Sequence, residues 1–547
     1  MRSVGLYSAT DQELPAVARA RERLTEIECV VRAGSDIESA DAARSFADRL
    51  VETDVVLFWL HGSDHRLPAY DAVREQLDAA DVPLFVTSSG TAEAVTDTTG
   101  DPAVRERLET YFEAGGAINI ANALRCAIDA ATAADIAYDD PVDLPQTGVY
   151  HPEHPGTDYA GLTATFDEDR PTVGIWFYES HWTNENTAYI DALVQAIEAA
   201  GANALPVFTT PVADEQRDAE WVATHWFSDD GRPIVDAVCS SFMFSLSMDE
   251  RGRDASDEGE RATEVFLDQL GVPVLQAITT MQSRAAYAES DIGLDGFEIA
   301  LSVALPEFDG AVITHPISGK ERARTDTDGT APTYHRPIDD RITHVAHLAV
   351  NWARLRRQPT AETDIAVVLH NYPPSDDGIG TAFGLDTPAS LHALLKQLDA
   401  AGYAVEDLPA DGQHLIETIV KQLTADGRWV DPAEIRATSV DVIEPGTYRE
   451  WFQALNDDLA EEIVTEWGAP PEHAIAIPGV RFGNVLVSIQ PPRGFEADPE
   501  TIYHDSALYP PHEYVAFYAW LRRRFDADAV VHLGTHGSLE WLPGKTV

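Results

Sequence analysis

Two histidines and one glutamate near the end of the chain could bind a metal ion or move protons. His532, His536 and Glu540 occur within nine residues of the segment AVVHLGTHGSLEWLPGK, residues 529–545. Imidazole and carboxylate groups are ligands for divalent transition metals, and imidazole exchanges protons near neutral pH. Their spacing would put them on one face of a helix, but two intervening glycines disfavour a regular helix. Alternatively, the histidines only hydrogen-bond to carbonyl groups of a loop.

The residues before this segment predict a strand that positions the first histidine. Residues 528–533 are mostly apolar and β-branched, and Gly534 and Gly537 follow them. Open α/β sheets bind ligands at the carboxyl ends of their strands, and glycine lets the backbone turn sharply or approach a flat substrate. We therefore expect His532, Gly534 and Gly537 to border a ligand-binding cleft.

Two other predicted strands end in polar residues that could reach the same cleft. The strand at 484–490 ends at Gln490 and leads into a proline-rich turn with Arg493, and the strand at 364–372 contains His370 near its end. Gln490 and Arg493 could bind a carboxylate of the ligand, because the planar guanidinium group binds carboxylates in bidentate fashion. The alternative for Arg493 is an ordinary surface arginine.

A helix is predicted at 513–525, and polar residues precede it. His504, Tyr509 and His512 could line the cleft as substrate-binding residues, although His512 could instead be a capping contact at the start of the helix. The GKT sequence at the end of the chain is not a phosphate-binding loop. Leu539 occupies the position of the first glycine in G-x-x-x-x-G-K-[ST].

Along the whole chain, short apolar strands alternate with alanine-rich helical patterns, which is typical of parallel α/β layers. We predict successive open, mostly parallel α/β domains of the Rossmann or flavodoxin-like type. The predicted boundaries are an N-terminal α/β domain at 1–145, a linker at 146–165, a second α/β domain at 166–320, a linker with a helix at 321–360 and a third α/β domain at 361–547.

The composition restricts the partners. With 92 acidic and 38 basic residues the net charge is −54, which disfavours binding to nucleic acid or to anionic lipid. Such a surface suggests adaptation to high salt, where screening is strong. Three widely spaced cysteines predict neither disulfides nor a thiolate zinc site. Without a signal sequence or an apolar stretch of membrane-spanning length, we expect a cytoplasmic protein.

Several motifs together resemble a known family. The segment HLGTHGSLEWLPGK is similar to one carried by the large subunits of tetrapyrrole chelatases, the family of the cobaltochelatase subunit CobN and the magnesium chelatase H subunit. The stretches GNVLVSIQPPRGFEADP at 483–499 and LYPPHEYVAFYAWLR at 508–522 agree with it. Those at 174–201 and 367–403 look more like CobN than like the magnesium enzyme.

The resemblance implies insertion of Co²⁺ into a corrin-type macrocycle of the hydrogenobyrinic acid a,c-diamide type during cobalamin biosynthesis. It also implies partner AAA+ ATPase subunits, CobS/CobT-like or like the magnesium chelatase I and D subunits, that use ATP and Mg²⁺. This chain is not expected to bind ATP. Alternatives are a magnesium or nickel chelatase with a porphyrin substrate, or a non-catalytic tetrapyrrole- or metal-binding protein.

The resemblance also suggests roles for individual residues. Glu540 is expected to accept protons or to relay the metal, and His532 and His536 to serve as metal ligands or bases. For Glu540 the alternative is a carboxylate that stabilises the start of a helix. Large chelatase subunits continue beyond this motif, so we expect an amino-terminal fragment that ends inside the catalytic domain, lacks its C-terminal part and is inactive alone.

Overall fold

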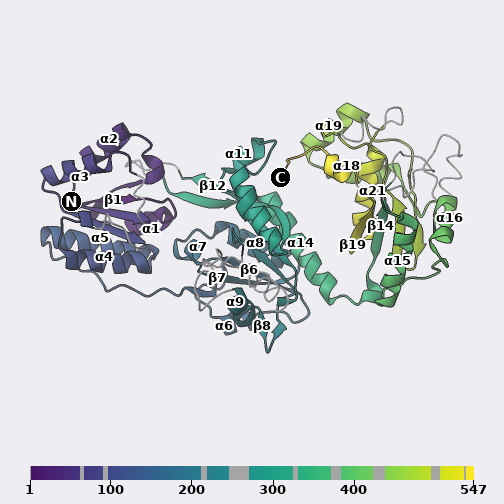
Figure 1. Cartoon of the computed structure of the whole chain (residues 1–547), viewed down its shortest axis with the longest axis horizontal. Coiled ribbons are helices and arrows are strands. Elements are labelled where there is room, and N and C mark those ends of the chain that lie inside the picture. The colour runs from purple at the N-terminus through teal and green to yellow at the C-terminus, as the bar shows by residue number, and fades with distance from the viewer. Residues whose placement is uncertain are drawn as a thin grey trace. The chain divides into compact units, whose positions relative to one another are not determined.

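The computed structural model describes residues 2–61, 67–89, 96–210, 219–245, 270–323, 331–370, 384–422, 438–494, 505–534 and 537–546. The chain divides into two compact units, Met1–Arg354 and Leu355–Thr546. Two mainly parallel sheets lie in the first unit and one in the second (Figure 1). The prediction of successive, mostly parallel α/β layers is confirmed. Among the described helices, none is both long and apolar enough to cross a bilayer.

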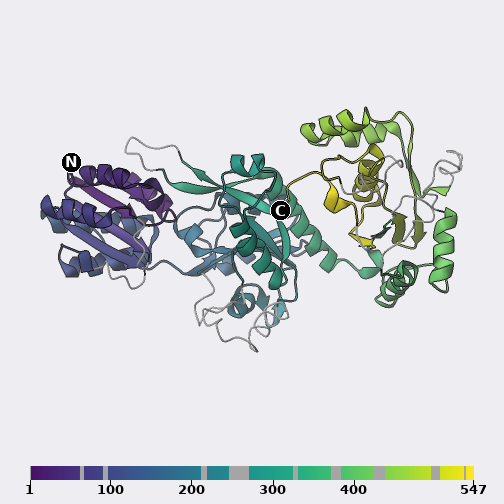
Figure 2. The ribbon, with the colours of Figure 1, turned by 45° about the horizontal axis from the view of Figure 1, so that its top comes forward.

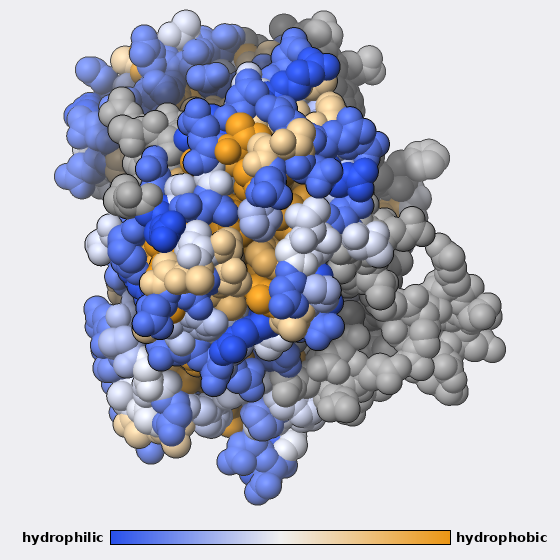
Figure 3. Space-filling view, turned by 90° about the vertical axis from the view of Figure 1, so that its left-hand side faces the viewer, coloured by the Kyte–Doolittle hydropathy of each residue, from blue (hydrophilic) through white to orange (hydrophobic). Residues whose placement is uncertain are grey.

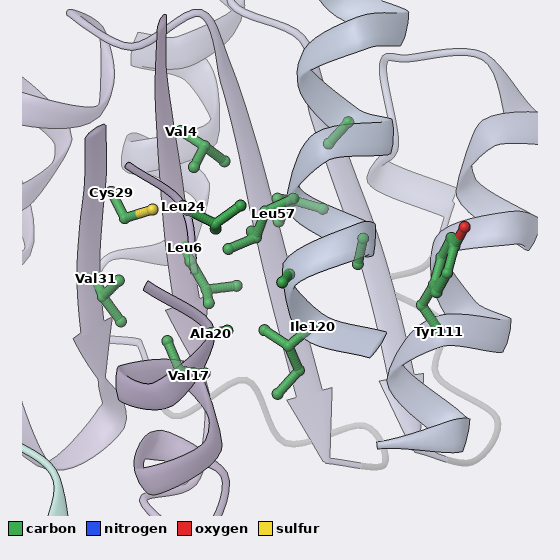
Figure 4. Packing of buried hydrophobic residues seen from close by; sticks show 14 of the residues in the cluster. Val4, Leu6, Val17, Ala20, Leu24, Cys29, Val31, Leu57, Tyr111 and Ile120 are labelled. Atoms are coloured by element: carbon green, nitrogen blue, oxygen red, sulfur yellow. The ribbon is translucent and has the colours of Figure 1, made fainter. Parts of the chain in front are cut away.

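The first sheet is fully parallel, with helices on both faces. Its strands, in spatial order, are β2 (Ile27–Ala33), β1 (Arg2–Ser8), β3 (Val55–His61) and β4 (Leu84–Ser89). One face packs against α1 (Leu14–Glu22), α4 (Pro102–Ala114) and α5 (Gly116–Thr132), the other against α2 (Ala40–Leu50) and α3 (Tyr70–Ala79). In Figure 4, Leu6 and Leu57 of the sheet approach Ile120 of α5, and Val17 of α1 closes the same core.

The second sheet is wider and mixed at its edges. Its order is β13 (Thr333–Pro337), β12 (Val312–Arg322), β11 (Val274–Thr279), β10 (Ala237–Ser240), β6 (Thr172–Tyr178), β7 (Asn203–Thr209) and β5 (Thr147–Val149). The two outermost pairs are antiparallel. Helices α8 (Ala188–Ala199) and α14 (Asp339–Arg357) cover one face, and α6 (Tyr159–Thr163) and α9 (Ala219–Trp226) belong to the other side.

The segment 146–165, predicted as a linker, contains a strand, and the segment 321–360, predicted as a linker with a helix, contains a strand as well as a helix. Strand β5 falls in the segment 146–165 and pairs with β7, while β13 and α14 fall within 321–360. Buried residues of α14, such as Val345 and Ala349, join the core of the second sheet. These segments look like linkers because they are polar and rich in turn residues. An edge strand forms by pairing with a distant part of the chain, so its own sequence does not reveal it.

The third sheet, in the second unit, carries the motifs of interest. Its order is β17 (Val480–Phe482), β18 (Val485–Ile489), β14 (Ile365–Leu369) and β19 (Ala529–Leu533), and only β17 is antiparallel. Helices α15 (Thr387–Ala400) and α16 (Gly412–Gln422) pack on one face (Figure 2). The other face holds α18 (Pro445–Gln453), α19 (Asp457–Trp467) and α21 (His512–Trp520), with a small sheet of β15 (Asp441–Ile443) and β16 (Ile475–Ile477).

Local sequence explains the ends of α15, the first helix described after β14. The side chain of Asp386 accepts a hydrogen bond from the backbone N–H of Ala389 at 3.1 Å and so caps the first turn. Just past the helix, Gly402 adopts a φ of 92°, a conformation that glycine reaches without strain.

Surface and interior agree with the composition. Hydrophilic residues cover most of the face shown in Figure 3, and hydrophobic residues gather near its middle. Cys29, Cys126 and Cys239 are buried and form no disulfide bond, so they pack in the cores as small apolar residues.

Candidate active site

Three neighbouring strands of the third sheet end at the same edge. Leu369, the last residue of β14, is in register with Ile489 of β18 and Leu533 of β19. The residues that follow β14 and β18 continue this alignment. The N–H of His370 donates to the carbonyl of Leu533 at 3.1 Å, and the N–H of Gln490 donates to the carbonyl of Leu369 at 2.9 Å. The carboxyl edge of the sheet therefore brings together chemical groups from segments that are far apart in sequence.

A cavity of about 240 Å³ lies at this edge. Besides the strand ends, its wall includes the glycine-containing segment that follows β19. The lining residues are Val368, His370, Gln490, His532, Leu533, Gly534, Gly537 and Glu540. This volume is below the roughly 300–1,000 Å³ typical of pockets that enclose a small organic ligand. The described residues therefore leave a cavity smaller than one that encloses a whole organic ligand.

Glu540 lies in a single turn of 3₁₀ helix, Leu539–Trp541, and its side chain is exposed. A Cβ atom at Gly537 would lie 3.4 Å from Oε2 of Glu540 and 3.7 Å from Nε2 of Gln490. The missing side chain at position 537 therefore leaves open the space between the carboxylate of Glu540 and the amide of Gln490.

The amide of Gln490 joins the sheet edge to the segment that carries Glu540. Its Oε1 accepts a hydrogen bond from the backbone N–H of Ser538 at 3.0 Å, and its Nε2 donates to the hydroxyl of Tyr518 at 2.9 Å. The hydroxyl groups of Tyr514 and Ser538 are also hydrogen-bonded, at 2.9 Å. Ser538 and Gln490 are buried, so this network fixes the start of the turn that holds Glu540.

His532 is held from the side of α21. Its Nε2 lies 3.1 Å from the hydroxyl of Tyr518, and the two rings meet edge to face. Burial lowers the pKa of His532 below its ordinary value, and the negative charge of Glu540 opposes this shift. The shift favours the neutral form of the imidazole, which can act as a ligand or as a hydrogen-bond partner.

The other predicted substrate-binding residues make contacts elsewhere in the second unit. Arg493 is 1% exposed, and its Nη2 donates to the carbonyls of Asp505 and Leu508 at 3.1 and 2.6 Å. His512 is buried; its Nδ1 lies 2.8 Å from the Tyr448 hydroxyl and its Nε2 lies 3.0 Å from the carbonyl of Gly468. Among the described residues, both side chains therefore make contacts that stabilise the fold.

The remaining predictions have different outcomes. Tyr509 packs at the border of the core behind the sheet, and its carbonyl accepts a hydrogen bond from the indole of Trp467. Neither Tyr509, His512 nor Arg493 lines the cavity. His504 and His536 lie outside the described residues. In the part of the chain that is described, no three His, Cys, Asp or Glu side chains lie close enough together for a metal site, so the set of His532, His536 and Glu540 stays a prediction.

Sequence reasoning missed the two tyrosines of α21 and the serine of the turn. Tyr514 and Tyr518 are four residues apart, which places both hydroxyl groups on one face of the helix. That spacing was a usable signal, but aromatic residues in an apolar helix look like core residues until a polar partner is known. The backbone role of Ser538 has no signal in its sequence context.

Comparisons with known proteins show the family to which the chain is similar. The family described as CobN/Magnesium Chelatase matches residues 109–547. The aerobic cobaltochelatase subunit CobN of Sinorhizobium sp is 36% identical over 458 residues, 81% of this chain and 34% of that protein. The magnesium-chelatase H subunit of Cereibacter sphaeroides is 32% identical over 428 residues, 74% of this chain and 34% of that protein.

A solved structure gives the same result at the level of the fold. The catalytic subunit of cobaltochelatase from Mycobacterium tuberculosis superposes with a TM-score of 0.76 at 29% identity, covering 100% of this chain and 44% of that one. The chain thus spans about a third of the length of the curated relatives named above. The family matches the sequence from residue 109 onward, and the fold of the solved structure matches the whole chain. The chain belongs to the CobN/magnesium chelatase family.

Proposed function

We propose that this chain is part of the large subunit of an ATP-dependent chelatase that inserts Co²⁺ into a corrin-type tetrapyrrole of the hydrogenobyrinic acid a,c-diamide type, a step of cobalamin biosynthesis. The observation that carries the proposal is the meeting of His370, His532, Gln490 and Glu540 around one cavity at the sheet edge. Family membership supplies the class of reaction.

Metal insertion first requires removal of the pyrrole N–H protons. Glu540 is the carboxylate among the described residues of the cavity wall, and its exposure lets it reach a substrate that sits over the cavity. A positioned general base typically accelerates proton transfer by roughly 10²–10⁴-fold. We assign this role to Glu540, with the conformation of its turn fixed by Ser538 and Gln490.

The ion must also lose its water ligands before it enters the ring. The imidazoles of His370 and His532 border the cavity, and His536 belongs to the same segment by sequence. Imidazole suits cobalt and nickel, whereas Mg²⁺ prefers oxygen ligands and keeps much of its hydration shell. This donor set favours Co²⁺ over Mg²⁺ as the substrate metal. A net charge of −54 further attracts divalent cations.

The proposal includes partners. A cavity of about 240 Å³ cannot by itself surround a tetrapyrrole, so we expect further parts of the large subunit to contribute walls. ATP hydrolysis is assigned to separate AAA+ subunits that use ATP and Mg²⁺.

An absorbance titration tests the proposal and separates its alternatives. The complete large subunit, with the AAA+ subunits and ATP, is mixed with hydrogenobyrinic acid a,c-diamide or protoporphyrin and with Co²⁺, Mg²⁺ or Ni²⁺. Cobalt-dependent turnover of the corrin substrate supports the proposal. Turnover with Mg²⁺ or Ni²⁺ identifies another chelatase, saturable binding without turnover identifies a carrier, and no binding contradicts both functions.

A further inference from the structure

A second cavity lies in the first unit, at the carboxyl ends of strands of the first sheet. Its volume is about 430 Å³, within the roughly 300–1,000 Å³ of pockets that enclose a small organic ligand. Trp59 of β3 and Thr87 and Ser88 of β4 belong to its wall. So does α7 (Glu179–Thr183), which directly follows β6 of the second sheet. The strand ends of one sheet and the first turn after a strand of another therefore meet at this cavity.

The cavity also lies where the strand order of the first sheet reverses. The chain passes from β1 to β2 on one side and then to β3 on the other side of β1. Trp59 of β3 is in register with Ser8, the last residue of β1. Gln12 and Glu13 follow β1 and line the cavity. The crevice at such a reversal is the usual ligand site of an open α/β sheet.

The wall of this cavity is acidic. Its glutamates are Glu13, Glu109, Glu113 and Glu179. None of the described lining residues is Lys, Arg or His. Two of the carboxylates have partners within the chain. Glu109 forms an ion pair with Arg105 at 2.8 Å, and Glu13 accepts a hydrogen bond from the hydroxyl of Thr10. The lining therefore repels anions and attracts cations.

Three polar side chains of the wall lack partners in the described part of the chain. Glu113 and Glu179 form no ion pair there. Burial raises the pKa of Glu179 to about 7, and no positive group counteracts the shift. Asn184, directly after α7, is only 7% exposed, and no described group donates to its amide or accepts from it. Buried polar side chains nearly always have a partner, so these groups mark where a ligand would bind.

We propose that this cavity binds a small organic cation that carries protonated amine groups. The N–H groups of an amine donate to the carboxylates of Glu113 and Glu179 and to the amide oxygen of Asn184, the acceptors that the wall leaves unused. Trp59 and Phe112, whose ring centroids are 4.4 Å apart, supply an apolar surface for the carbon skeleton.

A bare metal ion fits this cavity less well than an organic cation. Among the described residues, no three His, Cys, Asp or Glu side chains lie close enough together to hold a metal. A ligand of several ångströms can instead reach carboxylates that are far apart, because its amines sit at different ends of the molecule. The site contains none of the residues at the edge of the third sheet, so it does not depend on the proposed metal insertion.

Isothermal titration calorimetry of the full chain at constant KCl tests the proposal. The probe is 1,4-diaminobutane; butane-1,4-diol has the same length without charge, succinate carries the opposite charge, and Mg²⁺ carries the same charge without a carbon skeleton. We expect saturable binding of one diamine per chain and no saturable binding of the other three.

Variants locate the bound diamine. Glu179→Gln should weaken its binding by roughly tenfold, the effect of losing a hydrogen bond to a charged group. Glu113→Gln removes an exposed carboxylate and should weaken binding by about 2- to 5-fold. Glu75→Gln is the matched control, because it removes the same charge from an exposed position on α3, at the other face of the sheet. Its affinity should stay within about 1.5-fold of the unchanged protein.

Four results would overturn the proposal. They are the absence of saturable diamine binding, equally tight binding of the diol or of succinate, saturable binding of Mg²⁺ that Glu179→Gln abolishes, and an equal loss of affinity in Glu75→Gln and in the two cavity variants. The last result would mean that the net charge of the chain, and not the cavity, attracts the diamine. Far-ultraviolet circular dichroism confirms that each variant is folded.

Discussion

The backbone N–H of Ser538 is bonded to the side-chain oxygen of Gln490, and this contact joins the end of β18 to the turn that carries Glu540. Both residues are buried. The site is therefore held by an interaction between two segments that are 48 residues apart in sequence.

Replacing Gln490 by leucine should destabilise the second unit. Gln490→Leu introduces an apolar side chain of similar size but leaves the buried N–H of Ser538 without its acceptor, which costs about 1–3 kcal/mol. Denaturant unfolding measures this change. Gln397→Leu on the exposed side of α15 is the control and should stay within about 0.5 kcal/mol of the unchanged protein. Equal stabilities of the two variants would contradict the structural role of the contact.

A methyl group at position 537 should block the cavity with little effect on stability. Gly537→Ala puts a Cβ atom between Oε2 of Glu540 and Nε2 of Gln490, at ordinary contact distances of 3.4 and 3.7 Å. We expect metal insertion to fall about tenfold, because misplacing reacting groups by an ångström is costly. Steady-state kinetics of the complete chelatase measures this.

Gly544 is the matched control for that variant. It lies in the same motif, and a Cβ atom there meets nothing within 4 Å. Gly544→Ala should therefore insert metal at the unchanged rate. If both alanine variants lose activity equally, the loss reflects the motif as a whole and not the space beside Glu540.

The ends of β14, β18 and β19 illustrate what the sequence can predict. β14 and β18 are short apolar runs followed by a polar residue, and β19 carries His532 just before its last residue. In parallel sheets the carboxyl ends share one edge. The pattern of residue types is therefore enough to assign His370, Gln490 and His532 to one cleft, and the cavity lining agrees.

Arg493 and His512 illustrate where such reasoning stops. Both are polar residues in turns close to the motif, as ligand-binding residues often are. Among the described residues, Arg493 donates to the backbone carbonyls of Asp505 and Leu508, and His512 contacts the carbonyl of Gly468 and the hydroxyl of Tyr448. A sequence shows side-chain types but not which carbonyls face them, because that depends on how distant loops pack.

His512 should accordingly matter for stability. In His512→Ala the hydroxyl of Tyr448 and the carbonyl of Gly468 both lose a buried partner, and a cavity remains. We expect the free energy of unfolding to fall by about 2–4 kcal/mol. The control is His473→Ala at an exposed position, which should be nearly neutral. Macrocycle affinity of the folded His512→Ala protein should be unchanged, and a large loss there would favour direct binding.

Stability of the first unit should depend on pH through His181. The residue lies in α7 (Glu179–Thr183), where burial first and the charge of Lys320 second lower its pKa from 6.5 to about 4. Between these values the unfolded chain binds a proton that the folded protein does not, so stability falls as pH falls from about 6.5 toward 4. The full effect is about 3 kcal/mol.

The measurement is urea unfolding of the first unit's transition at several pH values. In His181→Phe the part of the slope due to this imidazole disappears between pH 6.5 and 5, above the range where most carboxylates titrate. Glu179 has the opposite sign, because burial raises its pKa to about 7. Glu179→Gln should therefore steepen the loss of stability on acidification, and parallel curves for all three proteins would contradict both assignments.

Removing the charge of Glu540 tests the proposed chemistry most directly. Glu540→Gln keeps the shape of an exposed side chain in the 3₁₀ turn but cannot accept a proton, so metal insertion should fall by roughly 10²–10⁴-fold. Macrocycle binding, followed by absorbance, should change little. Glu462→Gln, an exposed glutamate on α19, is the control and should keep full activity. Metal insertion by Glu540→Gln at the rate of this control would show that another group removes the pyrrole protons.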